Sequence, residues 1–263
     1  MNSYKTIKIL DVPVDMVNNQ LAMEVFREMM ETDGCKLIVT PNSEIVLNAT
    51  KNLELKRLIE QAGLVIPDGI GLVYASKILG EPLLERVTGV DFLNLILEYL
   101  EKTGKSIYLF GSKPANTERA SVAELAGMAM KKKHADLVIA GTRDGYFQKD
   151  DEEEIVREIN ASGADFLCAA MGSPKQEKFI FEHKEEFTTV KVGMGVGGSL
   201  DVWAGTARRA PEFYQKHGLE WLYRFIKEPA RYKRMAQLPL FIIKVIITFL
   251  VHRESPIFQR KTK

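Results

Sequence analysis

Short apolar runs alternate with amphipathic segments along residues 1–200 of the chain. The apolar runs are rich in β-branched and aromatic residues, which favour strands. They predict strands at Thr6–Leu10, Lys36–Thr40, Leu64–Ile66, Ser106–Phe110, Leu137–Ala140, Asp165–Ala170 and Val190–Val196. The amphipathic segments predict helices that include Gln20–Glu31, Leu53–Ala62, Gly89–Lys102, Asn116–Lys132, Asp151–Asn160 and Lys175–His183. Short apolar strands separated by helices are typical of βαβ units, so the pattern predicts an α/β fold with a largely parallel sheet and helices on both faces.

The pattern changes near Gly205, after the last predicted strand. The sequence TARRAPEFYQKHGLEWLYRFIKEPARYKRM that follows is helical, aromatic and basic. We therefore predict two parts, a Rossmann-like α/β domain over residues 1–200 and a helical appendage over residues 201–263. The aromatic side chains of the appendage would pack against the α/β domain, and a homo-oligomer contact stays an alternative.

The C-terminal part of the appendage contains a 14-residue run, Leu238–Val251, that is apolar except for Lys244 and Thr248. A helix that spans a membrane needs about 20 apolar residues, so this run is too short. Basic residues stand on both sides of it, including Arg231, Lys233, Arg234, Arg253 and Arg260. One interpretation is a buried or oligomer-contact helix. We favour the other, a helix that lies in the membrane interface, because a terminal apolar helix must find its own cover.

The overall composition narrows the classes of partner and compartment. The chain carries 36 basic and 35 acidic residues, for a net charge of +1, which argues against binding to nucleic acid. Cys35 and Cys168 lie in apolar runs, as expected of reduced core thiols in a cytosolic protein. The N-terminal sequence has no apolar segment of signal-peptide length, so we expect no export.

Polar residues follow several of the predicted strands at the point where a helix begins. In a parallel sheet, ligands bind beyond the carboxyl ends of the strands. The corners are TPNSE with Thr40 and Asn42, IPDG with Asp68, YLFGSKP with Gly111, and MGSPKQE with Gly172 and Gln176. Capping of the following helix could by itself explain one such corner, but it is a weak explanation for four of them in one chain. Together the corners predict an extended ligand with phosphate groups.

Asp68 stands between a rigid residue, Pro67, and the permissive Gly69 and Gly71. Proline fixes one torsion, and glycines allow another molecule to approach the backbone closely. A carboxylate held there can act as a general base toward a bound hydroxyl group. Capping of the next helix is the alternative, and we favour the catalytic role.

The last corner, GMGVGG, places Gly193, Gly195 and Gly198 in the spacing of a dinucleotide fingerprint. That fingerprint belongs on the first strand of a sheet and needs an acidic residue about 20 positions later, so a nicotinamide-dependent dehydrogenase is disfavoured. The four histidines are far apart, and the chain has no D-x-D, P-loop or G-x-S-x-G motif. We therefore predict no resident cofactor and no metal site.

Taken in order, these corners resemble the WecG/TagA/CpsF glycosyltransferase family. The matching stretches are TPNSE, IPDG, RVTGVDF, YLFG, GYF, MGSPKQE, GVGGSLDVWAG and RRAPEFYQKHGLEWLYRFIKEPAR. The resemblance implies an inverting, metal-independent transfer of N-acetylmannosamine from its UDP donor to undecaprenyl-diphosphate-linked N-acetylglucosamine. It further implies a β-1,4 linkage, a place on the cytoplasmic face of the membrane, and a role in teichoic acid or a related surface polysaccharide.

The resemblance also assigns roles to individual residues. It implies that Asp68 is the general base and that Thr40 and Asn42 form the corner that contacts the sugar. It implies that Arg86 binds phosphate and that Gln176 lies in the donor site. Arg224, Arg231 and Arg234 match basic appendage residues that complete the site over the diphosphates. We add Gly111, Gly172 and Gly195, the glycines of the later corners, to the predicted substrate-binding set.

Two other interpretations stay open. The same site could use another UDP donor, carrying N-acetylmannosaminuronate, glucuronate or glucose, to make a capsule or exopolysaccharide. The chain could instead be a membrane-associated protein that binds nucleotide sugars or assembles other enzymes without turnover. The substitution Asp68→Asn would distinguish a general base from a residue that only binds the ligand.

Overall fold

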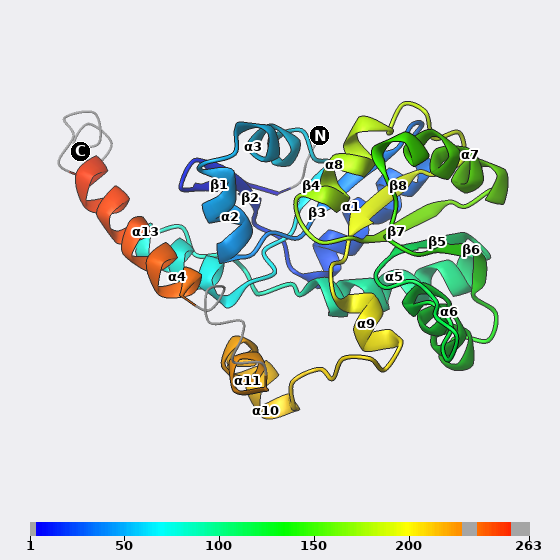
Figure 1. Ribbon diagram of the computed structural model, residues 1–263. Coiled ribbons are helices and arrows are strands. Elements are labelled where there is room, and N and C mark those ends of the chain that lie inside the picture. The colour runs from blue at the N-terminus through cyan, green and yellow to red at the C-terminus, as the bar shows by residue number, and fades with distance from the viewer. Residues whose placement is uncertain (1–3, 228–235, 254–263) are drawn as a thin grey trace.

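The computed structural model describes residues 4–227 and 236–253 of the chain (Figure 1). Its strands are β1 (Thr6–Ile9), β2 (Val12–Asp15), β3 (Lys36–Val39), β4 (Leu64–Val65), β5 (Ser106–Gly111), β6 (Val138–Arg143), β7 (Phe166–Ala170) and β8 (Val192–Gly195). Its α-helices are α1 (Asn19–Glu31), α2 (Ser43–Ala49), α3 (Leu53–Glu60), α4 (Ile70–Ile78), α5 (Gly89–Thr103), α6 (Val122–Lys133), α7 (Glu152–Ser162), α8 (Lys175–Glu182), α9 (Ser199–Trp203), α10 (Glu212–Lys216), α11 (Glu220–Lys227) and α13 (Gln237–Arg253).

Six parallel strands form the main sheet, in the order β4-β3-β8-β7-β5-β6. The predicted α/β fold with a parallel sheet is confirmed, and six of the seven predicted strands lie in this sheet. The chain runs from β3 to β4 at one edge, crosses to β5 in the other half, and returns to the centre at β8. The carboxyl ends of β4, β3, β8 and β7 are therefore neighbours, and the corners that follow them meet at one edge of the sheet.

The first predicted strand does not belong to the main sheet, and this part of the prediction is wrong. β1 pairs with β2 in a separate antiparallel hairpin, joined by Leu10 and Asp11 with φ angles of 51° and 62°. Positive φ at both central residues is the geometry of a tight hairpin turn that normally selects Asn-Gly. Leu-Asp lacks that signature, so the turn could not be recognised. The Asp15 carboxylate accepts a hydrogen bond from the Val65 amide at 2.8 Å and ties the hairpin to β4.

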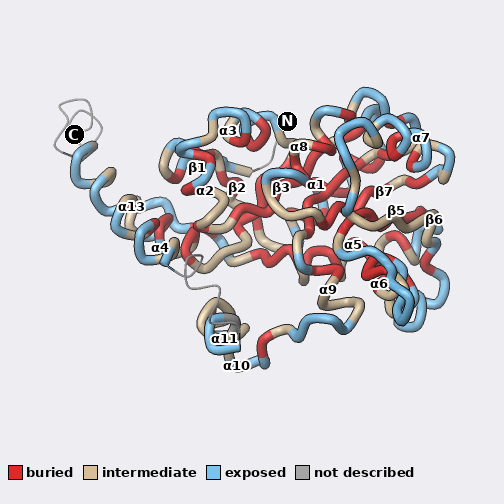
Figure 2. Tube along the Cα trace, viewed as in Figure 1, coloured by how far each residue is buried: buried red, intermediate tan, exposed pale blue. Residues whose placement is uncertain are grey.

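Side chains alternate between the two faces of the sheet, as the strand geometry requires. Leu37 and Val39 belong to one buried cluster, together with Phe179 of α8, whereas Ile38 belongs to the other, together with Phe26 of α1. Figure 2 shows the buried residues concentrated along the strands and on the inner sides of the helices. Helices thus cover both faces of the sheet, as predicted, and a buried cluster lies on each face.

One predicted helix begins later than the sequence pattern indicates. The prediction starts at Asn116, whereas α6 begins at Val122. Ser121 and Glu124 form a capping box, in which the Ser121 hydroxyl accepts from the Glu124 amide and the Glu124 carboxylate accepts from the Ser121 amide. This reciprocal cap fixes the first helical turn and leaves the preceding residues in a loop.

Both cysteines are buried and carry free thiols, as predicted for core residues. Burial raises the pKa of Cys35 to about 12. Cys35 is therefore protonated at neutral pH and acts as a small apolar side chain.

The helices that follow the last strand differ in their packing. α9 packs against α6, whereas α10 and α11 lie apart from the sheet layers (Figure 1). α13 packs against α2 and α4 and buries Phe241 and Val245 completely. Its opposite side exposes apolar side chains, with 53% of Ile243 and 55% of Ile247 accessible. Within the described ranges, no helix combines the length and apolar character that crossing a membrane requires.

Candidate active site

A cavity of about 540 Å³ opens at the carboxyl ends of β3, β4, β7 and β8. Six of the predicted site residues line it, namely Thr40, Asn42, Asp68, Arg86, Gly172 and Gln176. The appendage supplies the opposite wall, through Arg209, Glu220 and Trp221, and Leu238 of α13 closes one side. The fold therefore brings together residues that are nearly 200 positions apart in the sequence.

Asp68 follows β4 and is half-buried at the cavity wall. Its Oδ1 accepts a hydrogen bond from the Gly89 amide, the first residue of α5, at 2.9 Å. The N-cap residue of α4 is Gly69 and not Asp68. The bond to Gly89 fixes the orientation of the carboxylate at the positive end of another helix.

The glycines beside Asp68 lie where two corners of the sheet edge are in close contact. A Cβ atom on Gly69 would lie 3.0 Å from Asn42 Cβ, and one on Gly71 would overlap Ser43 Oγ. The two glycines thus let the corner after β4 pack directly on the corner after β3. This packing brings Asp68 close to Asn42, and both glycines also line the cavity.

Thr40 and Asn42, two polar residues of the corner after β3, both make hydrogen bonds. The Thr40 hydroxyl donates to the Gly195 carbonyl at 3.3 Å and is almost fully buried. Asn42 caps α2, and its Oδ1 accepts from the amides of Glu44 and Ile45 at 2.9 and 3.0 Å. Capping, one of the two roles considered for this corner, is thus real for Asn42, and the residue also lines the cavity.

Gln176 connects the two corners that follow β7 and β8. Its Oε1 accepts from the amides of Gly172 and Gly197, both at 3.1 Å, and its Nε2 donates to Glu177 Oε1 at 2.8 Å. The side chain is only 3% exposed. Gln176 therefore holds the backbone of these two corners in place. The sequence prediction missed Glu177, which is also buried and whose pKa is raised by loss of solvation.

Gly195 and Gly111, two of the predicted substrate-binding glycines, lie behind the wall rather than on it. A Cβ atom on Gly195 would lie 2.9 Å from Gln176 Cδ, and one on Gly111 would lie 2.6 Å from the Ala170 carbonyl carbon. Neither residue is among those that line the cavity. Both glycines allow close packing of the strand ends, and Gly111, with φ of 130°, also needs its conformational freedom.

Arg86 and Arg209 are the guanidinium groups of the cavity wall within the described part of the chain. Arg86 Nη2 lies 2.9 Å from Glu220 Oε2, and Arg209 makes a bidentate pair with Asp91, with N–O distances of 2.6 and 2.7 Å. The hydrogen bonds from Arg209 lower the pKa of Asp91. Arg209 was not among the residues predicted for the site, because its partner Asp91 is distant in the chain.

The predicted appendage arginines are less fully described. Arg224 is part of α11, and its side chain lies outside the described atoms. Arg231 and Arg234 lie outside the described residues altogether. The predicted role of these three arginines stays a prediction.

A second cavity, of about 740 Å³, lies away from Asp68. It runs between the β1–β2 hairpin and the outer half of α13, and its wall includes Ile7, Leu10, Leu79 and Ile247.

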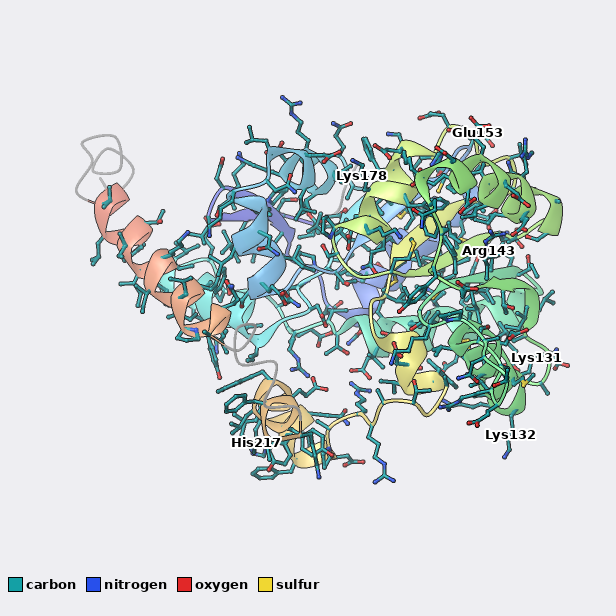
Figure 3. All side chains as sticks on the ribbon, in the orientation of Figure 1. Lys131, Lys132, Arg143, Glu153, Lys178 and His217 are labelled. Atoms are coloured by element: carbon teal, nitrogen blue, oxygen red, sulfur yellow. The ribbon has the colours of Figure 1, made fainter. Side chains whose placement is uncertain are left out.

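Charged side chains elsewhere on the molecule, such as Lys131 and Lys132 on α6 and Lys178 on α8, stand at the periphery (Figure 3). Within residues 4–227 and 236–253, no group of three or more metal-ligating side chains occurs.

Comparison with known proteins identifies the family of the chain. The model of the glycosyl transferase WecG/TagA/CpsF family matches residues 7–255. A Bacillus spizizenii (strain W23) protein, an N-acetylglucosaminyldiphosphoundecaprenol N-acetyl-beta-D-mannosaminyltransferase, is 35% identical over 209 residues, which cover 80% of this chain and 78% of that protein. A Staphylococcus aureus (strain MRSA252) protein of the same name is 36% identical over 208 residues, which cover 79% and 78% of the two chains. The match extends over both walls of the cavity, and the chain belongs to the WecG/TagA/CpsF family of glycosyltransferases.

Proposed function

We propose that this glycosyltransferase moves N-acetylmannosamine from UDP-N-acetylmannosamine to N-acetylglucosamine on a polyprenyl diphosphate, with inversion and a β-1,4 linkage. The observation that carries the proposal is one cavity that is lined both by an oriented carboxylate, Asp68, and by the guanidinium of Arg86. The names of the relatives support this donor sugar and acceptor over a uronate or glucose donor.

The chemistry is a single displacement. The acceptor hydroxyl transfers its proton to the Asp68 carboxylate, its oxygen forms a bond to the anomeric carbon, and the bond from that carbon to UDP breaks. The Gly89 amide donates a hydrogen bond to one Asp68 oxygen and so orients the carboxylate that accepts the proton. The Thr40 hydroxyl lies beside Gly89 and would position the sugar.

The leaving UDP carries negative charge that must be stabilised as the bond breaks. Arg86 lines the cavity, and we propose that it stabilises this charge together with Arg224, Arg231 and Arg234 of the appendage. We propose that fixed guanidinium groups, and no metal ion or other resident cofactor, fulfil this role.

The lipid-linked acceptor requires the enzyme to work at a membrane surface. We propose that the exposed apolar side of α13, which includes Ile243, Ile247 and Leu250, lies in the interface of the inner leaflet of the plasma membrane. The chain should bind anionic vesicles, and a variant with both Ile243→Glu and Ile247→Glu should lose this binding. Both positions are exposed, so the fold should tolerate the change.

The direct test of the function supplies the purified chain with a panel of UDP-sugars and a short-chain polyprenyl-diphosphate N-acetylglucosamine, with and without a chelator. We expect transfer from UDP-N-acetylmannosamine, unchanged by the chelator, with a β anomeric signal in the product. Transfer from a different donor would replace the proposed substrate, and binding of UDP-sugars without transfer would favour a non-catalytic protein.

A further inference from the structure

Four charged side chains form a network where the appendage meets the sheet domain. Arg86 and Asp91 come from the sheet domain, and Arg209 and Glu220 from the appendage. Glu220 lies 2.9 Å from Arg86 through one oxygen and 3.6 Å from Arg209 Nε through the other. A single appendage carboxylate therefore stands between the two guanidinium groups of the described cavity wall.

The pairing is well shielded from water. The side chains of Arg86 and Glu220 are 16% and 17% exposed. Arg86 Nη2 also donates to the Gln215 carbonyl of the appendage at 3.4 Å. Partial burial makes charge-assisted contacts stronger than surface pairs, so this state of the site holds the appendage against Arg86.

The described part of the cavity wall carries more carboxylates than guanidinium groups. Among the described lining residues, two cations, Arg86 and Arg209, stand against four carboxylates, Glu44, Asp68, Asp201 and Glu220. A UDP-sugar brings two further negative charges. A diphosphate that approaches Arg86 therefore meets a cation that already has an anion, Glu220, as its partner.

We propose that Glu220 occupies the diphosphate subsite as a tethered anion and that the substrate diphosphate exchanges with it. Arg209 then becomes a second diphosphate ligand beside Arg86. Its Nε hydrogen has no hydrogen-bond acceptor within the described part of the structure, although Glu220 lies close enough for an ion pair. This inference rests on the proposed function and adds Glu220 and Arg209 to it.

The exchange has a chemical basis in the shape of the two anions. A carboxylate offers two oxygens to a guanidinium, and a phosphate of a diphosphate offers the same planar pair with more charge.

The test measures the Kd of UDP for the full chain by calorimetry. Glu220→Gln keeps the size of the side chain and removes its charge, and we expect the Kd of UDP to fall about tenfold because Arg86 no longer has an internal competitor. Asp201→Asn is the matched control, because it removes the same charge from the same cavity and Asp201 pairs with Ser112 and Thr206 instead of an arginine. Its Kd should change less than twofold.

A double-mutant cycle tests the route of the effect. With Arg86→Gln in both proteins, the gain from Glu220→Gln should disappear. An unchanged or higher Kd in Glu220→Gln, an equal gain in Asp201→Asn, or a gain that persists without Arg86 would each overturn the inference. Those outcomes leave the proposed function standing if the unaltered chain transfers sugar, whereas absence of UDP binding in every variant would overturn both.

Discussion

The two walls of the cavity are held together in different ways. The sheet-side wall depends on hydrogen bonds between buried side chains and the backbone, such as Thr40 to Gly195 and Gln176 to Gly172 and Gly197. The appendage wall depends on ion pairs across a partly exposed seam, from Arg86 to Glu220 and from Asp91 to Arg209. Buried hydrogen bonds fix the first arrangement, whereas the proposed exchange with a diphosphate acts on the second.

The exposure of the appendage agrees with this contrast. Phe213 is 61% exposed and Ile226 is 58% exposed, so α10 and α11 place little of their apolar surface against the sheet domain. Figure 3 shows the side chains of this unit, with His217 labelled, gathered apart from the main sheet. The electrostatic contacts are thus a large part of what holds this wall in place.

Loss of the Gln176 side chain should have the largest effect on stability. Gln176→Ala leaves the amides of Gly172 and Gly197 without their acceptor and Glu177 without its donor, so the free energy of unfolding should fall by about 2 to 4 kcal/mol. Urea unfolding measures this. Gln20→Ala, on the exposed side of α1, should cost less than about 0.5 kcal/mol. Equal losses in both variants would remove the claim that the sheet-side wall is fixed by this residue.

The buried Glu177 carboxyl should make stability depend on pH. Its pKa is raised in the folded state by burial, so the folded protein holds the proton to a higher pH than the unfolded chain does. The stability associated with that proton is complete below the ordinary pKa of 4.5 and is lost as pH rises from there toward the folded value.

Glu177→Gln does not titrate and should therefore gain stability relative to the unaltered chain between about pH 4.5 and pH 8. Urea midpoints at these two pH values measure the change. Glu153→Gln, on the outer surface of α7 (Figure 3), serves as the control. A constant difference between Glu177→Gln and the unaltered chain across this range would show that burial does not govern this carboxyl group.

Salt should act on one wall only, and this is the smallest expected effect. Raising NaCl from about 50 to about 500 mM screens the ion pairs of the appendage, so exchange of the α11 amides should increase on the order of two- to fivefold. The amides of β3, β7 and β8 should not respond. Equal changes in both regions would contradict the division of the cavity into a fixed and a movable wall.

Sequence patterns predicted the main sheet because its strands are short apolar runs between amphipathic helices. The hairpin of β1 and β2 was missed because Leu10 and Asp11 adopt positive φ without a glycine. Asp68, Thr40 and Asn42 were found as polar residues at strand ends, which is a local signal. Glu220 and Arg209 were not assigned to the site, because their roles depend on contacts with Arg86 and Asp91 more than 100 residues away.

The most direct test of the account replaces Asp68 with asparagine and measures sugar transfer and UDP binding in the same protein. The account predicts that transfer falls about 10²- to 10⁴-fold, since the acceptor proton loses its base, while the Kd of UDP does not rise. Asp136→Asn, at an exposed position far from the cavity, should leave both values unchanged. Transfer by Asp68→Asn at the rate of the unaltered chain would contradict the central claim that this carboxylate takes the proton.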